Sequence, residues 1–328
     1  MNERDYDACP ENFLDFIAGS KGRVNRDFDL PIAITGTAGT GKSSVLKTSL
    51  FLHHGFNLEQ IQNPKDKELE KMKALIRSNM VLVPDFDLFK DKIENCPKKD
   101  YVAADEVLRM MNKKTWYNAD QIDLTTFFDE CRKDTLKIIG MAQPMFTNFE
   151  TYYRNSRIYV WIYCIGRTKT DAYGVAFLKD DIPGLSDPWN LKKIEKIWGK
   201  ARGRRHVSDI NSREKINILA KTPNFYFSWK LPKPSEKIIN FYKNEVKEAK
   251  IAFAKKLKTK AEIEGRTKKY RKALIKLIAH LYLEYAVDQK ELSKISGFSL
   301  GAINAYLKKA QVRPVDNTES NTNMVYTN

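Results

Sequence analysis

The stretch Gly36 to Ser43 (GTAGTGKS) decides the fold of this chain. It fits the pattern G-x-x-x-x-G-K-[ST] without a mismatch. It directly follows Leu30 to Thr35 (LPIAIT), a short apolar run that is typical of a buried parallel strand, and it opens a helical stretch, Lys42 to His54. A strand before the motif and a helix after it are the context that a phosphate-binding loop, or P-loop, requires.

The residue types of this loop suit the binding of ATP with Mg²⁺. The glycines let the backbone wrap a phosphate with its N–H groups, Lys42 neutralises the β and γ phosphates, and the Ser43 hydroxyl ligates Mg²⁺ at the positive end of the following helix. The alternative is a glycine-rich turn with a chance lysine. We expect cofactor contacts from the whole loop and the residue after it: Gly36, Thr37, Ala38, Gly39, Thr40, Gly41, Lys42, Ser43 and Ser44.

Strand-like and helical segments alternate along the N-terminal half of the chain. Apolar runs predict strands over 80–83, 101–104, 136–142, 158–165 and 173–178, and helical patterns lie between them over 65–78 and 125–133. The alternation predicts an α/β fold: a three-layer P-loop NTPase fold with a mainly parallel sheet, of the additional-strand type. The stretch 183–240 yields no predicted fold beyond a strand at the aromatic run 225–229, which base stacking would also explain.

A hydrolase also needs a carboxylate for the Mg²⁺ shell and a group that activates water, and two strand ends offer acids. MVLVPD ends at Asp85, a single acid, whereas YVAADE ends in the adjacent acids Asp105 and Glu106. Paired acids suit phosphoryl hydrolysis better, so we assign Asp105 to Mg²⁺ and Glu106 to the water. The alternative is a surface acid pair that opens a helix.

Three further residues are candidates for catalysis. Gln143 ends the strand over 136–142, where ligands of open α/β sheets bind, so it could sense the γ-phosphate; the alternative is an ordinary loop residue. Arg154 and Arg157 precede the strand over 158–165. One of them could reach the γ-phosphate of a neighbouring subunit, although arginines at the start of a strand are often surface residues.

The order of these features resembles that of the HerA/FtsK superfamily of ring-forming ATPases. The features are the P-loop, the intervening strand, the strand ending in Asp105-Glu106, the strand LKIIGMAQ after Arg132-Lys133 and the arginines that follow. The resemblance covers about residues 28 to 180. It is nearest to viral genome-packaging and zonular-occludens-toxin-like ATPases. It implies ATP-driven translocation of double-stranded DNA by a homo-oligomeric ring, a hexamer or pentamer, working with a portal, nuclease or other transfer component. The loop also resembles that of superfamily-one helicases, but 140–143 (GMAQ) lacks the Asp expected there, and the chain is short for two motor lobes.

The segment 289–309 (QKELSKISGFSLGAINAYLKK) resembles the helix-turn-helix of transcriptional regulators and resolvases. Leu292, Ser293, Gly297, Ile303 and Leu307 fall where that motif needs an apolar anchor, a small residue, a turn glycine and two core residues. The preceding segment supplies a third helix, with apolar residues at helical spacing: Leu274, Leu277, Ile278, Leu281 and Tyr285.

If the second helix enters a major groove, its outward side chains are Ser299, Leu300, Gly301, Asn304 and Lys308. Asn304 could read an adenine edge and Lys308 a phosphate, and basic residues before the motif, among them Lys268, Lys269 and Arg271, would contact phosphates. The alternatives are a three-helix module that binds protein and a basic stretch that is only a solvated helix face.

The charge is concentrated in one part of the chain. Its 328 residues carry 57 Lys and Arg against 41 Asp and Glu, a net charge of +16. Between Leu191 and Ala310 there are 30 bases and 11 acids, a balance of +19, so the remainder is nearly neutral. A surplus confined to one segment indicates a polyanion partner, and the adjoining helix-turn-helix favours DNA over anionic lipid.

These features predict five segments: a helical lead-in over 1–28, the ATPase domain over 29–240, a basic helical linker over 241–270, the helix-turn-helix domain over 271–311 and a disordered tail over 312–328. The N-terminus is polar, and the longest apolar run, 158–166, is far short of the ~20 residues that span a membrane. Four scattered cysteines argue against a zinc site or disulfides. We expect a cytoplasmic protein, in the host cytoplasm if it is viral.

Overall fold

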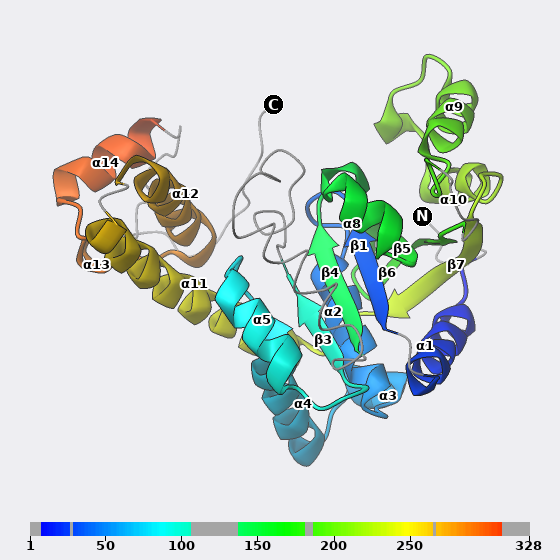
Figure 1. Cartoon of the computed structure of the whole chain (residues 1–328), viewed down its shortest axis with the longest axis horizontal. Coiled ribbons are helices and arrows are strands. Elements are labelled where there is room, and N and C mark those ends of the chain that lie inside the picture. Colours follow the sequence, from blue (N-terminus) through cyan, green and yellow to red (C-terminus); the bar gives the residue numbers. More distant parts are fainter. Residues whose placement is uncertain (1–7, 27–28, 106–136, 181–185, 265–266, 310–328) are drawn as a thin grey trace. The chain divides into compact units, whose positions relative to one another are not determined.

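The computed structural model describes residues 8–26, 29–105, 137–180, 186–264 and 267–309 (Figure 1). The chain divides into two compact units, Met1–Glu245 and Val246–Asn328. The first therefore contains the predicted lead-in and reaches five residues beyond the predicted end of the ATPase domain. Glu106, the predicted helix over 125–133 and the predicted tail lie outside the described residues.

The first unit is built on a seven-stranded sheet in the order β2-β3-β4-β1-β5-β6-β7. The five strands from β2 to β5 are parallel, while β6 and β7 are antiparallel additions at one edge. The strands are β1 (Leu30–Thr35), β2 (Met80–Val81), β3 (Tyr101–Ala104), β4 (Ile138–Gln143), β5 (Val160–Arg167), β6 (Asp171–Leu178) and β7 (Phe225–Pro232). The predicted α/β fold with a mainly parallel sheet is confirmed. The strand inserted between β1 and β3 in the sheet is β4, and β2 is an edge strand.

Helices cover both faces of the parallel strands, which explains why every residue of β1, β3 and β4 is buried. On one face lies α2 (Lys42–His53), whose Leu46 packs so closely on Gly140 of β4 that a Cβ there would lie 2.9 Å from the leucine. The other face carries α5 (Phe86–Asn95), α8 (Thr151–Ser156) and α10 (Ser212–Leu219), through Phe89, Tyr153 and Ile216. Shorter or flanking elements are α3 (Leu58–Gln62), α4 (Asp66–Asn79) and the 3-10 turns η4 (Phe146–Asn148) and η5 (Val207–Asp209).

The stretch that yielded no predicted fold contains α9 (Leu191–Arg202), α10 and β7. The aromatic run forms the start of β7 and is a strand, as predicted. Its Trp229 is fully buried and packs edge-on against Phe13, with 5.8 Å between the ring centroids. Phe13 belongs to α1 (Pro10–Asn25), which is longer than the short helix predicted around 13–18 and is part of the first unit. Burial of Trp229 removes it from any role in stacking bases.

The second unit is helical. It contains the C-terminal part of α11 (Glu236–Glu264), then α12 (Thr267–Tyr285), α13 (Gln289–Ser296) and α14 (Leu300–Lys309). These helices share a core of their own: Ala254, Leu257, Leu274, Leu277, Ile278, Leu281, Val287, Leu292, Ile295, Ile303 and Leu307. The predicted linker over 241–270 is thus mostly one long helix, α11, whose Ala254 and Leu257 pack into this core. None of the helices in the described ranges is long and apolar enough to cross a membrane.

Candidate functional site

The P-loop connects the carboxyl end of β1 to the amino end of α2, as its sequence context predicts. Gly41, the residue before α2, has φ of +101°, and a Cβ there would lie 2.8 Å from the Cβ of Ala172 on β6. A side chain at this position would therefore be strained by the backbone and blocked by its neighbour. The loop leads directly into α2, and the start of a helix after such a turn is where loops of this kind hold an anion.

Lys42 lies over the same loop. Its Nζ donates hydrogen bonds to the carbonyl oxygens of Gly36 at 2.8 Å and Thr37 at 2.9 Å. The ammonium group is thereby held at the mouth of the turn and half-buried. A fixed positive charge at the start of a helix can neutralise the phosphates of a nucleotide.

The structure brings Ser43 and Asp105 together and gives Asp85 a role at the start of a helix. The Ser43 hydroxyl donates to Asp105 Oδ2 at 2.6 Å, although the two residues are 62 positions apart. Asp85 instead begins α5, where its side chain accepts a hydrogen bond from the Leu88 N–H at 3.4 Å as a helix N-cap. Of the two carboxylates weighed in the sequence, Asp105 is the one beside the P-loop.

Gln143 ends β4 next to the last residue of β1, Thr35, with which it is in register. Its side chain is 1% exposed, and neither its amide nitrogen nor its amide oxygen has a hydrogen-bond partner within the described ranges. The next residue, Pro144, accepts a hydrogen bond from the Gly36 N–H at 3.2 Å. Gln143 is therefore a buried, unsatisfied amide at the strand end nearest the loop, which is costly to keep for folding alone.

Replacing Gln143 with leucine, which is close to it in volume, is expected to separate function from folding. Removing an unsatisfied buried amide should raise the free energy of unfolding by about 1 kcal/mol. If the amide senses the γ-phosphate, ATP turnover should fall roughly tenfold or more while nucleotide affinity changes little. Urea unfolding and steady-state turnover measure the two effects. A less stable variant with unchanged turnover per folded molecule would contradict the sensor role.

The two candidate arginines differ in position. Arg154 lies on α8, where burial lowers the pKa of its guanidinium while Asp187 and Glu150 act in the opposite direction. Arg157 follows α8 and precedes β5, and β5 pairs with β1 from Val160 beside Ile32 to Tyr163 beside Thr35. Arg157 is therefore at the end of the sheet opposite the P-loop, whereas Arg154 lies by Phe146, 6.0 Å from the centroid of that ring.

Sequence reasoning missed Arg167, the last residue of β5. A Cβ added to Gly39 of the P-loop would lie 4.0 Å from Arg167 Nη2, so this guanidinium is a neighbour of the loop. Its side chain is exposed and forms no ion pair with any residue that the structure describes. Only the sheet order, which sets β5 beside β1, identifies it as a possible phosphate contact.

In the second unit, α13 and α14 are joined by a short turn at Gly297, which has φ of +72°. Leu292, Ile303 and Leu307 are buried, and the Ser293 hydroxyl donates to the Phe298 carbonyl at 2.6 Å. The residues proposed to face a groove are all exposed: Ser299, Leu300, Gly301, Asn304 and Lys308. Lys268, Lys269 and Arg271 belong to α12, but their side chains are outside what the structure describes.

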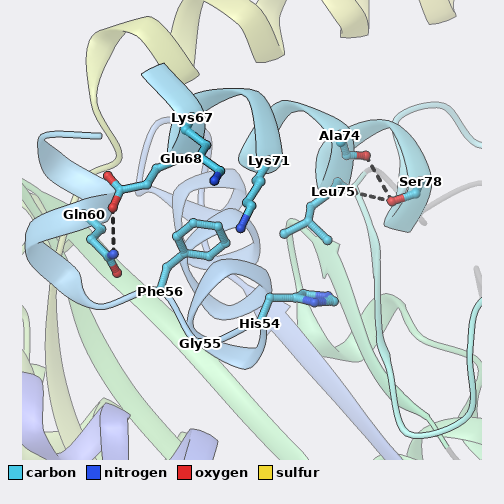
Figure 2. Close-up of a pocket in the computed structure, with 10 residues that line it drawn as sticks. All are labelled: His54, Gly55, Phe56, Gln60, Lys67, Glu68, Lys71, Ala74, Leu75 and Ser78. Carbon is cyan, nitrogen blue, oxygen red and sulfur yellow. Dashed lines mark hydrogen bonds between the residues drawn. The ribbon is translucent and has the colours of Figure 1, made fainter. Parts of the chain in front are cut away.

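A separate cavity of about 630 Å³ lies at the far end of α2 (Figure 2). Phe56 and Leu75 form its apolar part, and the side chain of Lys71 points toward Phe56. Since α2 has 12 residues, this cavity is about 18 Å along the helix from the P-loop. None of the site residues predicted from the sequence lines it.

The sheet order, with β4 between β1 and β3, and the loop between β1 and α2 define the fold of the P-loop nucleoside triphosphatases. No protein-family model matches the chain, and no curated protein matches it by sequence. Among solved structures it is similar to AMPPCP-bound DnaA from Aquifex aeolicus, with 12% identity over 94% of this chain and 92% of that one and a TM-score of 0.28. It is also similar to PCH-2 of C. elegans, with 13% identity over 90% of this chain and 68% of that one and a TM-score of 0.27.

Proposed function

We propose that this protein is an ATP-hydrolysing DNA translocase, a packaging or transfer motor that acts on double-stranded DNA. The observation that carries the ATPase part is the 2.6 Å hydrogen bond from Ser43 to Asp105, because it joins the hydroxyl of the P-loop motif to a carboxylate at the end of β3. Lys42 neutralises the phosphates, Glu106 activates the water, and Gln143 senses the γ-phosphate. Arg154 or Arg157 of a neighbouring subunit completes the site in a homo-oligomeric ring.

The donor set suits Mg²⁺. Ser43 and Asp105 supply hydroxyl and carboxylate oxygen, which are the hard ligands that Mg²⁺ takes alongside phosphate oxygens and water. These two residues would hold the ion, which would neutralise charge that develops on the phosphates. The chain's own part is to fix the hydroxyl and the carboxylate and to hold Lys42 against the carbonyl groups of Gly36 and Thr37.

DNA binding is proposed for the second unit because α13, the Gly297 turn and α14 have the spacing of a helix-turn-helix and leave Asn304 and Lys308 exposed. The opposite face of these helices is buried in the unit's own core, through Leu292, Ile303 and Leu307. The exposed face is therefore available to a partner.

The first unit shares the positive charge. The basic segment 191–310 places 14 Lys and Arg against 5 acids before the unit boundary at Glu245, and 16 against 6 after it. On α9, Lys192, Lys193, Lys196 and Lys200 are all exposed, and none forms an ion pair with another described residue. Like charges four residues apart destabilise a helix by a few tenths of a kcal/mol each, so a polyanion is the partner that this face favours.

Two measurements test the proposal. Linear duplex DNA should stimulate ATP turnover several-fold, and the stimulated protein should displace a third strand from a DNA triplex in the presence of ATP. Turnover and stimulation without displacement would instead support the alternative function, an ATP-dependent loader, regulator or target selector that switches assembly without moving along DNA. Unwinding of a duplex would support a helicase. Binding of ATP and DNA without any ATP turnover would indicate a scaffold and would contradict the proposal that the protein is an enzyme.

A further inference from the structure

Tyr242 of α11 contacts the proposed metal-binding carboxylate from a distant part of the chain. Its hydroxyl donates to Asp105 Oδ2 at 2.5 Å, across 137 positions of sequence. The same oxygen accepts from Ser43 at 2.6 Å. A carboxylate oxygen that accepts from two hydroxyl groups is held in one orientation, and because both donors are neutral, neither hydrogen bond cancels the negative charge of Asp105.

Lys47 holds the tyrosine ring from another side. It lies four residues after Ser43, on the same face of α2, and its Nζ is 3.6 Å from the centroid of the Tyr242 ring. Lys47 is only 3% exposed. Burial lowers the pKa of its ammonium group to about 8, while the charge of Asp105 acts in the opposite direction. A buried cation over the ring face fixes the plane of the phenol, and with it the direction of the hydroxyl.

The first turns of α11 are also anchored to the first unit. Arg77 of α4 lies over the ring of Phe241, 4.9 Å from its centroid, and its Nη2 is 2.7 Å from Oε1 of Glu245. The Ser235 N–H donates to the Ile61 carbonyl at 3.0 Å. Tyr242 therefore reaches Asp105 from a helix whose start is held in place, so its hydroxyl is presented to the carboxylate before any ligand binds.

We infer that Tyr242 is a positioning residue for the metal carboxylate: it orients Asp105 for a divalent cation and couples occupancy of that site to the first turns of α11. The inference rests on the proposed function, since it assumes that Asp105 takes part in binding Mg²⁺ with a nucleotide. It adds a residue that no motif contains. It also gives the metal site a direct link to the helix that continues beyond Glu245 into the second unit.

The test is Tyr242→Phe in the full chain, which removes the hydroxyl and keeps the ring. Tyr226→Phe is the matched control, because Tyr226 is 50% exposed on β7. Binding of a fluorescent ATP analogue is measured in EDTA and across a Mg²⁺ titration. We expect Tyr242→Phe to bind the analogue in EDTA as tightly as the unmodified chain does. In the Mg²⁺ titration it should need roughly tenfold more Mg²⁺ for the same gain in affinity, because the variant has lost one hydrogen bond to a charged group.

Amide hydrogen exchange supplies a readout that does not depend on turnover. In the unmodified chain, Mg²⁺ with a non-hydrolysable ATP analogue should slow exchange in the first turns of α11, and Tyr242→Phe should lose that effect. In an Asp105→Ala background the tyrosine substitution should change neither quantity. An unchanged Mg²⁺ titration for Tyr242→Phe would overturn the inference and leave the ATPase standing. If the unmodified chain binds no Mg²⁺–nucleotide, the proposed function fails, and the inference fails with it.

Discussion

Lys42→Ala is expected to abolish ATP turnover while leaving the affinity for duplex DNA within about twofold of that of the unmodified chain. Lys42 is the only lysine within the P-loop motif, and its ammonium group donates hydrogen bonds to the carbonyl oxygens of Gly36 and Thr37. Removing one preorganised charged donor from a phosphate site costs roughly 10²- to 10³-fold in rate, and here it also removes charge that binds the nucleotide. Turnover is measured by phosphate release, and DNA affinity by fluorescence anisotropy at a fixed salt concentration.

DNA affinity should survive because the second unit has its own core and carries the proposed DNA-facing residues of α14. Lys47→Arg is an unsuitable control, since Lys47 contacts Tyr242; Lys21→Ala on α1 is a better one, because Lys21 belongs to neither the P-loop nor the second unit. Loss of turnover and DNA binding together in Lys42→Ala, with a normal unfolding curve, would refute separate modules for the two activities.

Asp105→Asn is expected to reduce ATP turnover by roughly 10²-fold or more, whereas the same substitution at Asp85 should leave turnover within about twofold. Asp105 accepts hydrogen bonds from Ser43 and Tyr242, and an amide in its place loses the charge that a divalent cation requires. Asp85 caps α5, and asparagine is an equally good N-cap residue. The two variants therefore make the same chemical change at the two strand ends that the sequence offers as candidates for the metal carboxylate.

Steady-state turnover over a Mg²⁺ titration, with urea unfolding of each variant, measures this comparison. Both variants should unfold within about 1 kcal/mol of the unmodified chain, because neither substitution changes side-chain size. A large loss of turnover in Asp85→Asn, together with normal turnover in Asp105→Asn, would move the metal site to the end of the strand over 80–83 and overturn the assignment of Ser43 and Asp105 as partners.

Features that depend on neighbouring residues could be predicted from the sequence. The eight residues of the P-loop specify a turn that only glycines permit, between a strand and a helix that are recognisable from their own patterns. The turn at Gly297 and the buried positions Leu292, Ile303 and Leu307 lie within 16 residues of one another and follow helical spacing. In each case the interacting groups are close in sequence, so their periodicity and turn chemistry determine the local structure.

Features that depend on strand order were decided only by the tertiary structure. The approach of Arg167 to Gly39 and the contact of Tyr242 with Asp105 join elements that are far apart in the chain. Ser43 and Asp105 were assigned to one ion from their residue types, but their hydrogen bond also depends on the place of β3 in the sheet. The antiparallel pairing of β6 and β7, and the packing of α1 on Trp229, likewise leave no local signal. By itself the sequence determined that the chain contains a P-loop between a strand and a helix. The order of strands in the sheet determined which side chains surround that loop. Strand order is a property of the whole unit, because long-range pairing depends on packing throughout the unit and not on the residues beside each contact.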